Sequence, residues 1–150
     1  MLGFIKEINM DVFFYGLFMD VTFLLKNGIK PSNLRRGHLN DFALKIGNRA
    51  SLIPCKNEKS YGIVMTIDKD AIHNLYAEAS VADYIPEEVN IISNTNDFIP
   101  AICYNLPSES LTGANELYAI SLYKLAKKEG FPDDYLEKIK KMAKTTSSEK

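Results

Sequence analysis

An uninterrupted apolar run from Val12 to Tyr15 stops at Gly16, and a second apolar segment begins at once with Leu17. The run is rich in aromatic and β-branched residues, as buried strands are. Gly16 can take a positive φ and leaves room for a ligand close to the backbone. Gly28 fits the end of a short helix. The sequence therefore predicts a strand that turns into a helix at Tyr15-Gly16.

The turn at Gly16 has two explanations. Backbone N–H groups at the start of a helix have no partner within the helix, and they favour an anion such as a carboxylate. Short turns are also the commonest connection between elements, so ordinary packing explains the turn equally well. The turn alone does not decide between these two explanations.

Composition is that of one ordinary globular domain. The chain has 150 residues, of which 46% are hydrophobic and 25% charged, and its net charge is −1. This charge gives no field to attract nucleic acid or an anionic membrane. No run approaches the roughly 20 apolar residues of a membrane span. Lys6 and Glu7 interrupt the early apolar stretch, so we expect no signal peptide and a cytoplasmic protein.

Cysteine and histidine are too sparse to predict a disulfide framework or a metal site. Cys55 and Cys103 are the only cysteines, and each is expected to be a small buried residue or a free thiol. His38 and His73 lack the spacing of metal ligands. We expect no metal and no organic cofactor.

Alternating hydrophobicity and turn residues predict an α+β fold. Strands are expected at residues 12–15, 42–46, 50–54, 61–67, 89–92 and 99–106, with a polar loop at 56–60 and an irregular connection at 76–84. Asp68 is expected to cap a short helix that carries Ala71, Ile72 and Leu75.

The C-terminal third is expected to form a pair of helices. Apolar residues recur with helical spacing from Asn115 to Glu129, Gly130 ends this helix, and Pro132 begins the next. We expect a single domain over residues 1–143, with a barrel at about 10–106, a helical extension at about 114–143 and a disordered tail at 144–150.

Glu78 and Tyr84 are the candidate functional side chains outside the turn. Glu78 stands among small and apolar neighbours, and a partly desolvated carboxylate has a raised pKa that suits proton transfer. The alternative is an exposed loop glutamate. Tyr84 could orient a ligand through its hydroxyl, or it could anchor the loop by packing.

Tyr15-Gly16, Glu78 and Tyr84, in this order, resemble the γ-glutamylcyclotransferase-like superfamily, which includes the AIG2-like proteins. The resemblance covers roughly residues 12–106, and the helical tail looks like an elaboration found in one bacterial branch. It implies a small mixed β-barrel with a cavity at the barrel mouth.

The resemblance also implies a mechanism. Backbone amides of Gly16, Leu17 and Phe18 would hold a γ-glutamyl compound, with Tyr15 and Tyr84 as further substrate-binding residues. Glu78 would accept a proton from the substrate's α-amino group, and the freed amine would attack the γ-carbonyl to form 5-oxoproline and release an amine or amino acid. The Glu78 carboxylate is then expected to face the cavity beside these amides.

The sequence departs from the family pattern at several positions. Leu17 replaces the usual Ser or Thr, Asn74-Leu75 stands where the family has Leu-Asp, Ala79 replaces a frequent Gly, and Pro86 replaces an Arg. A second hypothesis is therefore a small-molecule-binding module without turnover. A third reading makes the helical tail an interaction surface, with a homodimer suggested by the tyrosines Tyr118, Tyr123 and Tyr135.

Overall fold

The structure is a computed structural model that describes residues 9–148, with side chains described as far as Ala143. Its elements are β1 (Asn9–Phe14), the 3-10 helix η2 (Leu17–Met19), α1 (Val21–Lys26), β2 (Ser32–Ile46), β3 (Ala50–Asp68), α2 (Lys69–Leu75), β4 (Ile85–Ser93), β5 (Phe98–Asn105), the 3-10 helix η3 (Ser108–Ser110), α3 (Glu116–Lys128) and α4 (Asp133–Ser148). The mixed α+β class predicted from the sequence is confirmed.

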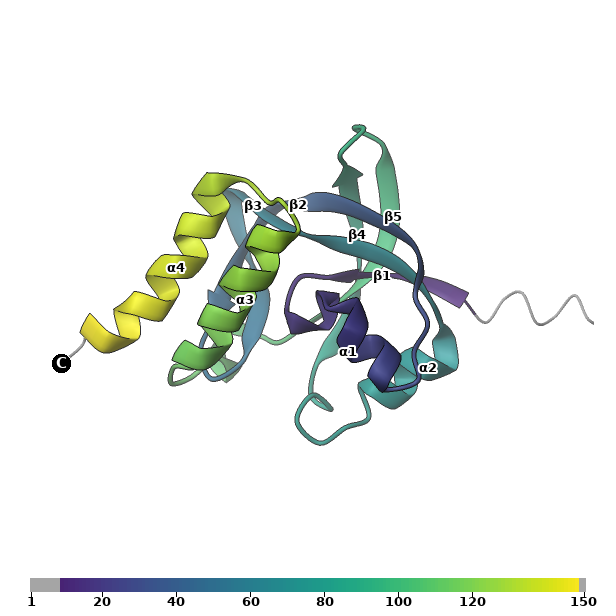
Figure 1. Ribbon diagram of the computed structural model, residues 1–150, viewed down its shortest axis with the longest axis horizontal. Coiled ribbons are helices and arrows are strands. Elements are labelled where there is room, and N and C mark those ends of the chain that lie inside the picture. The colour runs from purple at the N-terminus through teal and green to yellow at the C-terminus, as the bar shows by residue number, and fades with distance from the viewer. Residues whose placement is uncertain (1–8, 149–150) are drawn as a thin grey trace, which may run out of the picture.

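The five strands form one curled sheet in the order β1-β3-β2-β4-β5. All pairs are antiparallel except one, in which Val12 of β1 pairs in parallel with Ile102 of β5 and brings the two ends of the sheet together. Helices α3 and α4 lie side by side against one side of the sheet, whereas α1 and α2 lie away from them (Figure 1). The chain between β1 and α1 therefore sits between two groups of helices.

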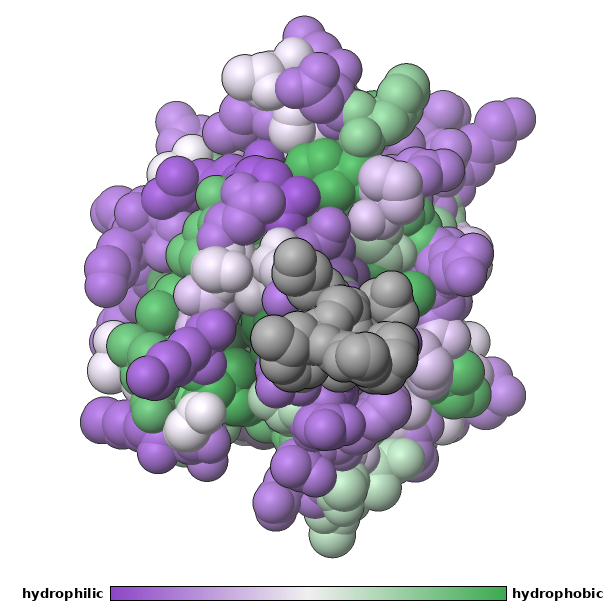
Figure 2. All heavy atoms as spheres, turned by 90° about the vertical axis from the view of Figure 1, so that its right-hand side faces the viewer, coloured by the Kyte–Doolittle hydropathy of each residue, from purple (hydrophilic) through white to green (hydrophobic). Residues whose placement is uncertain are grey.

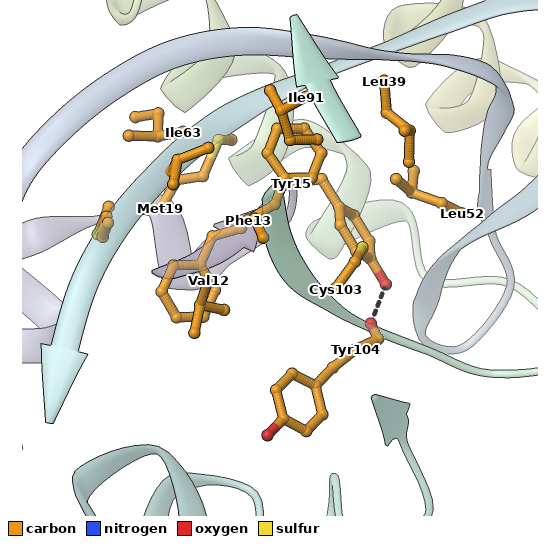
Figure 3. Packing of buried hydrophobic residues seen from close by; sticks show 14 of the residues in the cluster. Val12, Phe13, Tyr15, Met19, Leu39, Leu52, Ile63, Ile91, Cys103 and Tyr104 are labelled. Atoms are coloured by element: carbon orange, nitrogen blue, oxygen red, sulfur yellow. Dashed lines mark hydrogen bonds between the residues drawn. The ribbon is translucent and has the colours of Figure 1, made fainter. Parts of the chain in front are cut away.

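Strand β1 lies in the hydrophobic core. Val12, Phe13 and Phe14 are at most 3% exposed. Successive side chains of a strand point to opposite faces, so three consecutive buried residues mean that both faces of β1 are covered. Figure 3 shows Val12 and Phe13 among buried side chains of other strands, including Ile63 and Ile91.

The C-terminal helices are part of this core. Leu122 of α3 and Ile139 of α4 are at most 1% exposed. Asn115 caps α3 by accepting a hydrogen bond from the Tyr118 amide at 3.0 Å, and Gly130 takes the positive φ of 80° that the predicted helix end requires. The predicted helix pair is confirmed, and it packs against the sheet as an integral layer.

Ion pairs also join the helical layer to the sheet. Arg36 of β2 contacts Glu129 at 2.9 Å, and Lys138 of α4 contacts Glu58 of β3 at 2.6 Å. These pairs are partly exposed to solvent, so each contributes little to stability, about 0–1 kcal/mol. Burial of apolar side chains is the main attraction between the two layers.

The polar segment 56–60 is not a loop, and this expectation is corrected. It belongs to β3, where Lys59 pairs with Asn40 of β2. Polar composition does not prevent a strand, because most of these side chains face water while Lys59 and Ser60 pair with β2. A register shift after Asn40 is accommodated by Asp41, at φ 66°, whose side chain accepts a hydrogen bond from the Asn57 amide at 2.9 Å.

Helix α4 is longer than the sequence suggests. It continues to Ser148, five residues beyond the expected end of the domain at residue 143, and residues 149–150 lie outside the described part of the chain. After Pro132 the sequence contains no further Gly or Pro, so nothing local stops the helix.

The aromatic residues behind the dimer hypothesis do not form an exposed face. Tyr135 is 4% exposed and contacts Tyr61 of the sheet at a ring distance of 5.0 Å, while Lys140 lies over the ring of Tyr123. Figure 2 views the molecule from the side opposite α4, and that side is largely hydrophilic, with separate hydrophobic areas among charged and polar ones. Scattered exposed apolar residues of this kind are normal in globular proteins.

The burial of α3 predicts a large difference between two leucines of the same helix. Leu122→Ala should lower the free energy of unfolding by about 2–5 kcal/mol, because it leaves a cavity in the core. Leu117 is 78% exposed, so Leu117→Ala should change stability by no more than about 0.5 kcal/mol. Urea denaturation followed by circular dichroism measures both, and equal effects would show that α3 does not pack as described.

Candidate functional site

The chain leaves β1 at Phe14 and makes one 3-10 turn before α1. Asp20 caps α1 by accepting a hydrogen bond from the Thr22 amide at 3.0 Å. Gly16 has φ −114° and ψ −152°, which is extended backbone, so the expectation of a positive φ at this residue is wrong. Gly28 does take the predicted positive φ, 78°, just after α1.

A close approach, and not backbone strain, explains the glycine at position 16. A Cβ atom added there would overlap the Tyr118 hydroxyl oxygen of α3. The same hydroxyl accepts a hydrogen bond from the Leu17 amide at 3.3 Å. Burial raises the pKa of Tyr118, so the hydroxyl stays protonated. Tyr118 of helix α3 thus occupies the Leu17 amide, which the sequence analysis expected to be free to hold substrate.

Two further amides of the turn remain available. Among the residues that the structure describes, the amides of Gly16 and Phe18 have no hydrogen-bond acceptor, whereas Met19 and Asp20 donate back to Gly16 and Leu17. The turn therefore keeps donors that can bind a carbonyl or carboxylate oxygen, although fewer than the sequence predicts.

A cavity of about 560 Å³ lies at this turn. Its size is within the range of about 300–1,000 Å³ that is typical of small-molecule sites. The residues that line it are Phe13, Phe14, Tyr15, Gly16, Leu17, Phe18, Asp20, Phe23, Arg49, Ala50, Tyr76, Ser80, Val81, Tyr84, Tyr118, Ser121 and Leu125. All five residues that the sequence predicts to bind substrate, Tyr15, Gly16, Leu17, Phe18 and Tyr84, are among them.

The cavity walls are aromatic, and two tyrosine hydroxyls are held by backbone carbonyls. Tyr15 donates to the Tyr104 carbonyl at 2.8 Å (Figure 3), and Tyr84 donates to the Ala50 carbonyl at 2.6 Å. Tyr76 stacks on Tyr104 with 3.9 Å between ring centroids. Burial raises the pKa of Tyr15 and Tyr76 well above that of free tyrosine, so both are neutral. A ligand therefore meets mainly ring surface.

Arg49 is the positively charged residue that lines the cavity, and Asp83 compensates its charge. Its guanidinium holds both carboxylate oxygens of Asp83, at 2.7 and 3.0 Å, and also donates to the Ser80 carbonyl at 3.1 Å. These hydrogen bonds lower the pKa of Asp83. The pair fixes the segment 76–84 against the start of β3, next to Tyr84, whose ring lies 5.7 Å from the guanidinium carbon.

Glu78 does not line this cavity. It is exposed and borders a separate hollow of about 200 Å³ with residues of the α1 end and of α2, among them Gly28 and Leu75. The expectation that its carboxylate faces the Gly16–Phe18 amides is therefore not met. The segment that carries it turns through hydrogen bonds from Val81 to Glu78 and from Tyr84 to Val81, and it presents Ser80 and Val81 to the cavity instead.

The lining residues that sequence reasoning did not single out include Asp20, Arg49, Tyr76 and Tyr118. Tyr118 and Arg49 are distant in sequence from the turn, and no local pattern marks them. Tyr76 precedes Glu78 by two residues, so the same segment does contribute to the site, through a different side chain.

The described residues give little support for a metal site, a disulfide or a membrane-spanning helix. Between residues 9 and 148 no group of three or more His, Cys, Asp or Glu side chains could hold a metal ion. Cys55 is exposed, Cys103 is buried, and both are free thiols. Of the helices in this range, none combines the length and apolarity needed to cross a bilayer.

Comparisons by sequence found no matching family model and no matching curated protein. Comparison of the structure with solved structures found clear similarity. A γ-glutamyl cyclotransferase aligns over 88% of this chain and 86% of its own, with TM-score 0.68 and 20% identity. YkqA from Bacillus subtilis aligns over 93% of this chain but 55% of its own, with TM-score 0.71 and 18% identity.

An AIG2-like protein from Mus musculus is also similar, with TM-score 0.53 and 17% identity over 65% of this chain and 77% of its own. At these identities the likeness establishes the fold and not the activity. The chain thus has the γ-glutamyl cyclotransferase-like fold, as the sequence resemblance implied. The aligned share for the cyclotransferase exceeds the segment 12–106, so the likeness extends beyond it.

The contact between Gly16 and Tyr118 predicts strong coupling between two substitutions. Gly16→Ala should lower the free energy of unfolding by about 1–3 kcal/mol, because the added methyl group overlaps the hydroxyl oxygen. In a Tyr118→Phe background the nearest remaining ring atom lies 3.7 Å from that methyl group, an ordinary contact. The same Gly16→Ala change should then be nearly neutral.

A double-mutant cycle by chemical denaturation measures this coupling. Additive effects of the two substitutions would contradict the described contact.

Proposed function

We propose that this protein binds a small organic molecule in the cavity beside the Tyr15–Phe18 turn, as a binding module on the γ-glutamyl cyclotransferase-like fold. One observation carries the proposal: the residues expected to bind substrate all line a single cavity, and the expected base, Glu78, lies outside it. Binding needs the cavity alone, whereas the expected chemistry needs the Glu78 carboxylate within reach of the bound ligand.

The chemistry of the cavity defines what such a ligand offers. Aromatic rings from Phe14, Phe18, Tyr76 and Tyr84 favour an apolar body through burial and ring stacking. The free amides at the turn supply donors for one oxygen acceptor. A γ-glutamyl amino acid or γ-glutamyl amine has both features when its leaving group is apolar.

A second candidate is γ-glutamyl cyclotransfer itself, and the fold likeness over most of the chain favours it. In this reaction the α-amine of the substrate attacks its own γ-carbonyl, the bond to the leaving amine breaks, and 5-oxoproline forms. Glu78 would take the proton from the α-amine, and the amides at the turn would stabilise the oxyanion. The attack is intramolecular, so positioning supplies much of the rate.

Because Glu78 is exposed in this structure, this second reaction requires the turn segment 76–84 to rearrange when substrate binds. The Arg49–Asp83 pair opposes such a movement, since it ties this segment to β3.

Filling the cavity should abolish binding. Ser121 is an exposed residue of α3 that lines the cavity, so Ser121→Trp places an indole there without disturbing the core. Isothermal calorimetry with a panel of γ-glutamyl amino acids and amines should detect binding to the unmodified protein and none to this variant. Ile120→Trp, on the same helix but outside the cavity lining, is the matched control and should bind normally. Equal binding by the two variants would place the ligand elsewhere.

Turnover decides between the two candidates. The same panel, assayed for 5-oxoproline, should give no product if the protein is a binding module. Product formation that falls by at least about 10²-fold in Glu78→Gln would establish the cyclotransferase and its base. Product formation unchanged in Glu78→Gln would show that Glu78 is not the base.

A further inference from the structure

We infer that the cavity takes a ligand that carries an ammonium group, and that Asp20 is the residue that binds this group. The inference rests on the proposed binding function and specifies the class of ligand, an organic amine with an apolar or aromatic body. It derives from the charges and the aromatic rings that line the cavity.

The charge balance of the cavity is negative. Among the described residues that line it, only Asp20 and Arg49 are charged. The Arg49 charge is already neutralised by the two hydrogen bonds to Asp83, and a bidentate pair of this kind is among the stronger polar contacts. Arg49 is therefore a poor partner for an anionic ligand, and the carboxylate of Asp20 is left without a counterion.

The position of Asp20 is fixed while part of its hydrogen-bonding capacity stays open. Its Oδ1 atom accepts the hydrogen bond from the Thr22 amide, which holds the side chain at the start of α1. No ion pair involves Asp20 in the described part of the chain. A carboxylate has about four acceptor positions, so it can receive an ammonium group without losing its capping role.

Aromatic rings line the same cavity as Asp20. Phe18 and Phe23 stack with 5.5 Å between centroids and 11° between planes, and Tyr76 meets Phe18 edge-on at 5.7 Å. Phe23 is 39% exposed although it is a large apolar residue. Ring faces carry partial negative charge and attract cations. A carboxylate beside such rings is a suitable environment for an alkyl- or arylammonium group.

Two small probes that differ in one group test the inference. Phenethylamine is a cation at pH 7, and 2-phenylethanol has the same body with a neutral hydroxyl. Titration of the full chain, followed by NMR chemical shifts, gives both dissociation constants. The amine should bind about fivefold more tightly than the alcohol, the effect expected of a partly exposed ion pair. Asp20→Asn should remove this preference and leave the affinity for the alcohol unchanged.

A matched control separates charge from capping. Asp68 caps α2 in the same way, by accepting from the Asp70 amide at 2.9 Å, but it does not line the cavity. Asparagine is a good N-cap, so both Asp20→Asn and Asp68→Asn should keep the fold. Only Asp20→Asn should change the preference for the amine, and thermal unfolding verifies that both variants are folded.

The outcomes distinguish this inference from the proposed function. Equal affinities for the two probes, or an amine preference that survives in Asp20→Asn, would overturn the inference. If the probes fail to bind while the cavity accepts a γ-glutamyl compound, the inference is wrong and the binding function stands. If none of these compounds binds, both are wrong.

Discussion

The pairing of β1 on both of its edges is the constraint on which the rest of the structure depends. The strand is antiparallel to β3 along its whole length and joins β5 through the parallel pair of Val12 and Ile102, which brings the sheet round on itself. A strand covered on both edges and both faces has to be apolar, and residues 12–14 are.

Because β1 ends inside the molecule, the chain must turn sharply at Gly16. The Tyr15 hydroxyl then ties the end of β1 to β5 through the Tyr104 carbonyl. The cavity lies at the end of this strand.

The cavity depends as much on the helical layer as on the sheet. Tyr118 of α3 reaches the turn so closely that a Cβ atom at position 16 would overlap its hydroxyl oxygen, which accepts a hydrogen bond from the Leu17 amide. The two sides of this contact are 101 residues apart in the chain. The core packing of Leu122, one turn further along α3, therefore supports the position of Tyr118. Stability of the helical layer and geometry of the cavity are linked through one helix.

Local sequence patterns predicted those strand, cap and helix-end positions that neighbouring residues determine. The apolar run before Gly16, the cap at Asp68 and the helix ending at Gly130 were all predictable from sequence, because neighbouring residues determine them. The strand at 56–60 was not, since its polar composition gives no strand signal and its end is held by the pairing of Lys59 and Ser60 with β2.

The site follows the same division. The turn residues and Tyr84, which are proposed to bind substrate, lie in segments that local patterns mark. Arg49 and Tyr118 line the same cavity only because the fold brings them there. Glu78 had two readings from the sequence, a partly desolvated carboxylate or an exposed loop glutamate. The structure has it exposed, while Ser80 and Val81 of the same segment line the cavity.

The residues that depart from the family pattern lie in the cavity lining or in segments that contribute to it. Leu17 lines the cavity directly, so the change from a hydroxyl side chain to an apolar one alters the ligand surface. The remaining departures lie in or beside the segment 74–86, from which Tyr76 and Tyr84 reach the cavity.

The buried strand residues meanwhile form a contiguous core. A sheet closed by backbone pairing places few demands on loop side chains, so this fold can persist while the side chains that line the cavity vary. The charge and aromatic content of the cavity are therefore better guides to the ligand than the fold is.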